Sequence, residues 1–432
     1  MRRWSVIPFV ALVLFLPFLF GGCEEDIKYY EWNMVQLETE DGGKYVCGNG
    51  SAYKFFVNPS LTSDNVLIYY EGGGACWDYA SCSGQSGIRG AANPNGIPDD
   101  YMEGFSIPAI MSPFIFRAHP WERVDTQNWT IIFVPYCTGD IFIGDNTATY
   151  KSEDSEESLE WRHNGFENTQ GILDWMTNGP FSHHFDTIPK LMVTGCSAGG
   201  AGAFLNYHFI RKGLDDRVGE AILLNDSGPI YYTTTDEEPD NLDPNWNGVL
   251  SSGHLHAKIK AAWDVDKVLN RIGDVTGLNR NDYGSLNTVL SYMYPYDKLA
   301  HTQFTRDAIY SGYSYDRFYG SPPPSQEEIH NMWADDQTYL LAMYKDLFTE
   351  NKNTGYFVPY YRPFNESHCS CVLSFDDTDI TGAGMNVRDY ANQLLDSDLS
   401  MAGMRIYEEP SEEELNRPYI FWDLLDLLMG AL

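Results

Sequence analysis

Basic residues are scarce in this chain. It has 432 residues, with 28 Lys and Arg against 61 Asp and Glu, and its formal charge is −33 at neutral pH. A protein that binds DNA or RNA needs a cationic face to displace the counterions held by phosphates, and this charge repels polyanions and anionic lipid headgroups at long range. The composition therefore argues against nucleic acid as a partner. It gives no indication of the oligomeric state.

The chain has only one apolar run long enough to suggest export or membrane contact. Two arginines precede an apolar run over residues 4–20, and two glycines then lead to Cys23. This order is typical of a secretory signal, and two prolines in the run argue against a membrane-spanning helix. It resembles the signal of a bacterial lipoprotein, so we expect residues 1–22 to be removed and Cys23 to carry a lipid that attaches the protein to a membrane. Ordinary secretion is the alternative, because Phe20 stands where such signals usually carry Leu.

No two cysteines have the C-x-x-C spacing, which argues against thioredoxin-type chemistry and c-type haem. Without Cys23 the chain has seven cysteines, so in an oxidising compartment at least one should stay unpaired. Cys76 and Cys82, six apart in a Gly-rich loop, are the favoured disulfide pair. Cys196 ends an apolar run and is expected to be a buried free thiol. The other four could pair in several ways: Cys47, Cys137, Cys369 and Cys371.

The ten histidines lack the spacing of a zinc site, since His183 and His184 are adjacent and His254 and His256 are two apart. A metal-dependent deacetylase is therefore disfavoured, and we expect neither a metal nor a cofactor. Residues 243–248 imitate the start of a calcium-binding loop, but His254 stands where that loop needs Glu, so we interpret the segment as a turn.

Apolar residues are plentiful, at 43% of the chain, and their distribution predicts an α/β fold. Near-continuous apolar runs predict buried parallel strands, and helical patterns alternate with them. The predicted strands are residues 65–70, 129–136, 190–195 and 220–225; the predicted helices are 157–176, 198–214 and 327–348; the predicted long loops are 83–108 and 233–247. We expect one domain over residues 23–432, with a mostly parallel sheet flanked by helices.

A G-x-S-x-G motif follows one of the predicted strands and precedes a predicted helix. Its serine is Ser197, in the sequence Gly195-Cys-Ser-Ala-Gly199. This context is typical of a nucleophile elbow, where small flanking residues allow a strained turn that exposes the serine at the N-terminus of a helix. The alternative is a Gly-rich turn with an ordinary helix-capping serine. We predict that Ser197 is a catalytic nucleophile.

A serine esterase also needs hydrogen-bond donors for the oxyanion. The glycine run 72–74 follows the first predicted parallel strand and is typical of the loop that supplies half of an oxyanion hole. We predict the donors to be the N–H groups of Gly73, Gly74 and Ala198. A structural glycine turn is the alternative.

The remaining members of a Ser-acid-His triad are predicted from chain order. His368 is the only histidine among the last 100 residues, where the general base of an α/β-hydrolase occurs. Three carboxylates lie between nucleophile and base at plausible positions: Asp226, Asp307 and Asp316. Each is equally compatible with a solvated surface residue.

Five short segments then resemble one family. EGGGAC at 71–76, PYCTGD at 135–140, GCSAGGAG at 195–202, NDSGP at 225–229 and SHC at 367–369 are similar to motifs of the pectin acetylesterase and Notum family of serine hydrolases. The resemblance implies an α/β-hydrolase variant with Ser197 as nucleophile and His368 as base. It favours Asp307 as the acid, because the family's acid lies in a segment like QFTRD.

The resemblance implies deacylation of carbohydrate or protein esters. Removal of the signal would take away two arginines and no acidic residue, leaving a charge of −35. Such a protein is repelled by polygalacturonate unless salt screens the charge, or unless Arg89, Arg117 or Arg162 forms a local basic patch. We therefore expect a serine carboxylesterase that removes acetyl groups from a polysaccharide, a neutral one being a reasonable candidate. The alternatives are a deacylase of a non-carbohydrate ester and a catalytically silent surface-binding lipoprotein.

Overall fold

The structure is a computed structural model that describes residues 27–37, 43–87, 90–233, 252–316, 318, 323–397 and 400–415. The predicted signal 1–22, Cys23, Arg89 and nearly all of the predicted loop 233–247 lie outside the described residues. In the part of the chain that is described, no helix combines the length and the apolar character needed to cross a bilayer.

Nine strands form one twisted sheet in the order β1-β2-β4-β3-β7-β8-β9-β10-β11. The β1–β2 and β2–β4 pairs are antiparallel and the other pairs are parallel. The strands are β1 Asn33–Gln36, β2 Lys54–Asn58, β3 Val66–Tyr70, β4 Thr130–Val134, β7 Ile188–Cys196, β8 Val218–Asp226, β9 Lys298–Thr302, β10 Thr354–Val358 and β11 Arg405–Tyr407. This mostly parallel sheet confirms the predicted α/β-hydrolase-like class.

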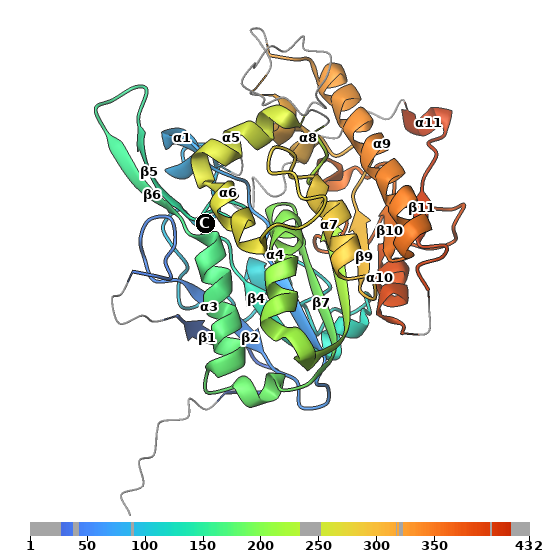
Figure 1. Ribbon diagram of the computed structural model, residues 1–432, viewed down its shortest axis with the longest axis horizontal. Helices are drawn as coiled ribbons and strands as arrows, with labels where there is room; N and C mark the ends of the chain where they lie inside the picture. Colours follow the sequence, from blue (N-terminus) through green and yellow to red (C-terminus); the bar gives the residue numbers. More distant parts are fainter. Residues whose placement is uncertain are drawn as a thin grey trace, which may run out of the picture.

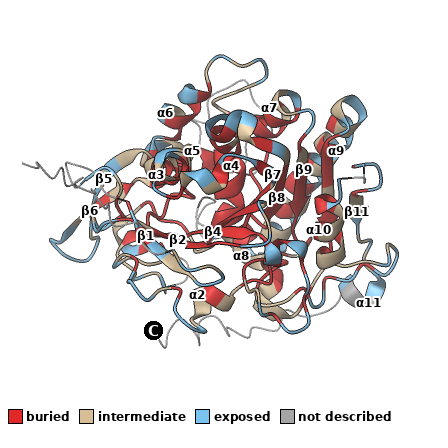
Figure 2. Ribbon diagram, turned by 90° about the horizontal axis from the view of Figure 1, so that it is seen from below, coloured by how far each residue is buried: buried red, intermediate tan, exposed pale blue. Residues whose placement is uncertain are grey.

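The four predicted strands are β3, β4, β7 and β8, which lie in the middle of the sheet. Every residue of β3 and β4 is buried, as are the last six residues of β7 and of β8. A strand that is covered on both faces has no solvent side for polar residues, and this accounts for the continuous apolar runs. Figure 2 shows the buried residues gathered in the sheet and in the helices that cover it.

Helices cover the sheet and close its carboxyl edge. The first of them, α3 (Gly165–Asn178) and α4 (Ala198–Leu214), lie in front of the sheet in Figure 1, with α4 packed on β7 and β8. The others are α1 Tyr79–Cys82, α2 Ile107–Ile110, α5 Gly253–Trp263, α6 Val265–Leu269, α7 Ser285–Met293, α8 Ala308–Tyr315, α9 Gln326–Asn351, α10 Val387–Leu395 and α11 Glu412–Leu415. The predicted helices 198–214 and 327–348 are therefore confirmed.

The predicted helix 157–176 is wrong over its first third. Residues 158–163 form β6 (Ser158–His163), which pairs with β5 (Asn146–Lys151) in a separate two-stranded antiparallel sheet that projects beyond the main sheet in Figure 1. Alternate side chains of β6 turn inward, and Trp161 is buried with its indole N–H donated to the carbonyl of Thr138 at 2.9 Å. Alternation with period two favours a strand over a helix.

Candidate active site

Ser197 occupies a strained turn between β7 and α4. Its φ of 58° and ψ of −124° lie in a region that residues other than glycine rarely adopt. The turn needs small neighbours, because a Cβ on Gly195 or Gly199 would lie 2.4 or 2.1 Å from the carbonyl oxygen of Tyr70. The backbone N–H of Ser197 donates to the carbonyl of Asp226 at 2.9 Å, which anchors the turn to the end of β8. This geometry is that of a nucleophile elbow.

Two of the three predicted oxyanion donors, Gly74 and Ala198, line the same cavity as Ser197. Gly73 and Gly74 have φ values of 145° and 55°, which only glycine adopts without strain, so the loop after β3 can turn its backbone toward the elbow. Gly74, Ser197 and Ala198 line one cavity. In the described part of the chain, no protein acceptor takes the N–H of Gly73, Gly74 or Ala198. These groups are thus free to stabilise a negative charge.

Asp307 and His368 meet beyond the carboxyl ends of β9 and β10. Asp307 Oδ2 lies 2.8 Å from His368 Nδ1, and both side chains are almost completely buried. The other carboxylate oxygen of Asp307 accepts the backbone N–H of Tyr310 at 2.9 Å, since Asp307 is the N-cap of α8. The pair therefore has the geometry by which an acid fixes the orientation and tautomer of a histidine.

His368 lies close to the elbow but shares no hydrogen bond with Ser197 in the described structure. The link between the two segments is covalent, because Cys196 and Cys369 form a disulfide bond. A ring nitrogen of His368 lies within 4.8 Å of both sulfur atoms. The expectation that Cys196 is a free thiol is therefore wrong: the partner lies 173 residues away, and sequence spacing does not reveal such a contact.

The other two candidate acids occupy different places in the described structure. The buried carboxylate of Asp226 accepts the backbone N–H groups of Ser370 at 2.9 Å and Cys371 at 3.0 Å, so it fixes the loop that follows the histidine. Asp316 lies at the C-terminal end of α8, at the far end of the helix from Asp307. Asp307 is therefore the candidate whose carboxylate lies within hydrogen-bond distance of His368.

The remaining cysteines form two further disulfide bonds. Cys76 pairs with Cys82, as predicted, and Cys47 pairs with Cys137. Cys371 is the free thiol among the described residues, and it is buried. Two groups of Cys and His side chains lie close enough to hold a metal ion, Cys76–Cys82–His163 and Cys196–His368–Cys369. Their sulfurs are in disulfide bonds, which leaves no thiolate to serve as a ligand.

The cavity beside Ser197 has a volume of about 580 Å³ with its open mouth included, and its lining is aromatic and uncharged. Its walls come from six separate parts of the chain. The lining residues are Gly74, Ala75, Trp77, Ile141, Ser197, Ala198, Pro229, Ile230, Tyr231, Ser252, Leu255, His256, Ile259, Trp263, Tyr310, Tyr313 and Ser314. Helices α5 and α8, which supply many of them, lie together at the upper end of the sheet in Figure 1.

Two buried charged residues near the site were not singled out from the sequence. The guanidinium of Arg362 packs between the rings of Phe304 and Phe364 and donates to the carbonyls of His368 and Cys369. Glu71 precedes the glycine run, and burial raises its pKa to about 7, although the Tyr101 hydroxyl and a backbone N–H donate to it. The sequence alone does not show whether a single basic or acidic residue is buried or lies on the surface.

Neither of the described arginines considered for a basic patch lines the cavity. Arg117 donates to Asn58 and to the carbonyls of Gln127 and Trp129, so it joins loops together. Arg162 forms an ion pair with Glu160 at 3.0 Å on β6. Among the described residues, the cavity lining therefore offers no lysine or arginine to an anionic substrate.

Comparison with known proteins supports the resemblance noted in the sequence. A family model described as Pectinacetylesterase matches residues 25–262. Pectin acetylesterase 4 of Arabidopsis thaliana is 27% identical over 230 residues, which cover 49% of this chain and 51% of that protein. Palmitoleoyl-protein carboxylesterase notum1' of Xenopus laevis is 24% identical over 184 residues, 42% of this chain and 33% of that protein. The match thus spans about half the plant relative and a third of the frog relative, and the chain belongs to the pectinacetylesterase family.

Proposed function

We propose that the protein is a serine carboxylesterase that removes acyl groups, acetyl first among them, from a polysaccharide. The observation that carries the proposal is the 2.8 Å contact between Asp307 and His368, with His368 held beside the elbow that presents Ser197. The free N–H groups of Gly74 and Ala198 support it, because both residues line the same cavity as Ser197, with Gly73 next to Gly74 in the chain. Membership of the pectinacetylesterase family agrees with this chemistry.

The reaction proceeds through an acyl-enzyme. His368 accepts the hydroxyl proton of Ser197 as the oxygen attacks the ester carbonyl, and Asp307 stabilises the imidazolium that forms. The N–H groups of Gly73, Gly74 and Ala198 bind the oxyanion. His368 then donates the proton to the leaving sugar oxygen. A water molecule, activated by the same histidine, hydrolyses the acyl-enzyme and releases the acid.

An uncharged glycan fits the electrostatics of the chain best. The net charge of −33 opposes the approach of a polyuronate, and the described residues that line the cavity beside Ser197 include no lysine or arginine to offset it. A neutral acetylated polysaccharide is not repelled by the net charge and needs no basic side chain in the cavity. The aromatic walls of the cavity also suit the apolar faces of sugar rings.

The same walls favour a second candidate, a non-carbohydrate ester with an apolar acyl group. Trp77, Trp263, Tyr310 and Tyr313 provide far more apolar surface than an acetyl methyl needs. A series of aryl esters from acetate to octanoate separates the two candidates. A polysaccharide deacetylase should prefer acetate, whereas an acyl pocket should increase kcat/KM by roughly 10-fold for every two methylene groups that it buries.

The test of the proposed function is labelling and product release. A fluorophosphonate should label the wild-type protein at Ser197, and the Ser197→Ala variant should resist labelling. Acetate release is then measured from acetylated xylan, pectin and chitin oligomers. A wild-type protein that takes no label and releases no acid contradicts the proposal, and favours the alternative of a silent binding protein that keeps the fold.

Export is part of the proposal. Three disulfide bonds in the described residues favour an oxidising compartment. We expect the chain to be cleaved before Cys23 and anchored by a lipid there. The mass of the mature N-terminal peptide tests this point, because a lipidated cysteine and a freely secreted chain differ by the mass of the acyl chains. An unmodified N-terminus would leave secretion as the route.

A further inference from the structure

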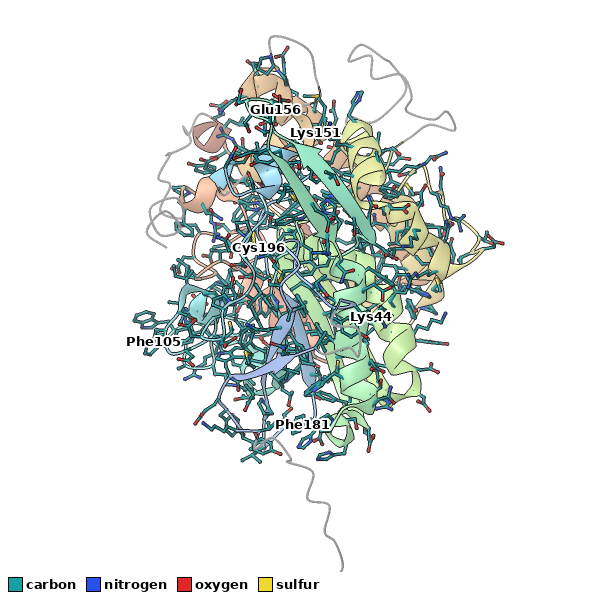
Figure 3. The ribbon with its side chains drawn as sticks, turned by 90° about the vertical axis from the view of Figure 1, so that its left-hand side faces the viewer. Lys44, Phe105, Lys151, Glu156, Phe181 and Cys196 are labelled. Atoms are coloured by element: carbon teal, nitrogen blue, oxygen red, sulfur yellow. A yellow bond between two sulfur atoms is a disulfide. The ribbon has the colours of Figure 1, made fainter. Side chains whose placement is uncertain are left out.

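One disulfide bond connects the segments that carry the proposed nucleophile and base. Cys196 immediately precedes Ser197, and Cys369 immediately follows His368. Both cysteines are buried, and Figure 3 shows Cys196 in the interior of the molecule. The shortest covalent path from the serine to the histidine therefore runs through this bond and its two cysteines.

The segment that carries Cys196 and Ser197 is held firmly by the sheet and by α4. Ser197 accepts the N–H of Ala201 at 3.0 Å within the first turn of α4, and its own N–H is bonded to β8. Cys196 is the last residue of β7, in the middle of the sheet. A residue paired in this way changes position little without local unfolding.

The segment that carries His368 is a short, distorted 3-10 turn (Phe364–Ser367) rather than a helix or strand of the main fold. Asn365, Glu366, Ser367 and Cys369 all have positive φ, at 52°, 48°, 57° and 60°. Residues other than glycine in this region are unfavourable and persist only where their surroundings hold them. The position of the histidine therefore depends on tertiary contacts.

Hydrogen bonds among the described residues fix part of the position of His368, but none of them lies on the side that faces Ser197. Asp226 and Ser227 bind the backbone N–H groups of residues 369–371, and Arg362 binds the carbonyl of His368 at 3.3 Å. Asp307 holds the Nδ1 edge of the ring. In the described structure no hydrogen bond joins His368 to Ser197, and the disulfide is the direct connection on that side.

We propose that the Cys196–Cys369 disulfide is a positioning device that keeps His368 within reach of Ser197. This inference rests on the proposed esterase function. A proton transfer between serine and histidine requires the two groups at about 2.6–3.2 Å, and a shift of roughly 1 Å can reduce turnover about 100-fold. A covalent bond between their neighbours limits such a shift.

The test compares two disulfide deletions. Cys196→Ala/Cys369→Ala removes the proposed device, and Cys47→Ala/Cys137→Ala removes a buried disulfide with a separation of 90 residues that joins neither Ser197 nor His368 to its neighbour. Because loop-closure entropy changes slowly with length, both variants should lose a similar amount of thermal stability. With aryl acetate, at a temperature where both are folded, we expect the first to lose at least about 10-fold in kcat with KM within about 3-fold, and the second to keep its kcat.

A second measurement separates positioning from general weakening. In a His368→Ala background the Cys196→Ala/Cys369→Ala change should lower the remaining kcat no further, because its effect passes through the histidine. An equal loss in both backgrounds, or an unchanged kcat in the folded double variant, would overturn the inference.

The proposed function is tested independently in the same assay. Activity of the wild-type protein and its loss in Ser197→Ala establish the esterase, whatever the cysteine variants do. A wild-type protein without activity contradicts the proposed function. An active wild-type protein whose turnover is insensitive to the Cys196–Cys369 bond contradicts the positioning role alone.

Discussion

Asp307 and His368, 61 residues apart in the chain, lie 2.8 Å apart at the end of two neighbouring parallel strands. The segments that lead to them stay paired beyond β9 and β10, since the N–H of Thr305 donates to the carbonyl of Pro359 and that of Arg306 to the carbonyl of Tyr360. The sheet thus extends as a two-stranded arm almost to the acid. Backbone pairing therefore helps to fix the acid, whereas the base follows an irregular segment with positive φ values and depends on tertiary contacts.

The first prediction concerns the base. His368→Ala should lower kcat for an aryl acetate by a factor of about 10³ or more, because no other group accepts the proton of Ser197. His183→Ala, an exposed histidine in the turn before β7, should retain normal turnover. Steady-state kinetics and circular dichroism of both variants test this. Near-normal turnover in a folded His368→Ala variant would contradict the assignment.

The second prediction separates the acid from its nearest competitor. Asp307→Asn should lose on the order of 10² to 10⁴ in kcat, since the amide neither stabilises the imidazolium nor fixes the same tautomer. Asp226→Asn should mainly lower stability, by about 1–3 kcal/mol, because an amide offers one oxygen to the two N–H groups that the carboxylate binds. An active Asp307→Asn variant beside a folded, inactive Asp226→Asn variant would reverse the assignment.

The sequence predicts best what depends on local pattern. Strands β3, β4, β7 and β8 contain near-continuous apolar runs because helices cover both faces of the central sheet, and the elbow follows from small residues next to Ser197. The hairpin β5–β6 is the opposite case. The residues of β6 alternate between more and less exposed and lie just before α3. The pattern that predicts a helix over residues 157–176 therefore includes them by mistake.

Features that join segments far apart in the chain cannot be predicted from the local sequence pattern. The pairing of Cys196 with Cys369, and the union of Trp77, Trp263 and Tyr310 in one cavity, join segments far apart in the chain. Spacing alone left three candidate acids, and Asp307 was favoured only through the family resemblance. Asp307 comes close to His368 because the segments that lead to them follow the paired strands β9 and β10.

The third prediction concerns the buried carboxyl of Glu71. Burial raises its pKa to about 7 from an ordinary value near 4.5, so the folded protein keeps a proton that the unfolded chain has lost between these pH values. The contribution of Glu71 to stability is therefore greatest below about pH 4.5 and is lost as the pH rises to about 7. Glu71→Gln removes this dependence.

Urea unfolding of both proteins at pH 5 and pH 8 measures the effect. Relative to the wild type, Glu71→Gln should be more stable at pH 8 than at pH 5, by about 2–3 kcal/mol in the difference. Other buried groups with shifted pKa values, such as Asp140 and Asp282, are present in both proteins and cancel. A stability difference that does not change with pH would contradict the assignment of Glu71 as the titrating group.

The fourth prediction joins the net charge to the substrate. If the charge of −33 opposes an anionic glycan, then kcat/KM on acetylated polygalacturonate should rise with added salt, while a neutral acetylated xylan should respond little. Initial rates from about 0.02 to 1 M NaCl cover Debye lengths from roughly 20 to 3 Å. The sign of the slope decides the question, because the described residues that line the cavity beside Ser197 include no lysine or arginine that would produce the opposite sign. Falling activity on the polyuronate with constant activity on xylan would show that a basic patch elsewhere attracts the substrate, and would make pectin the better candidate.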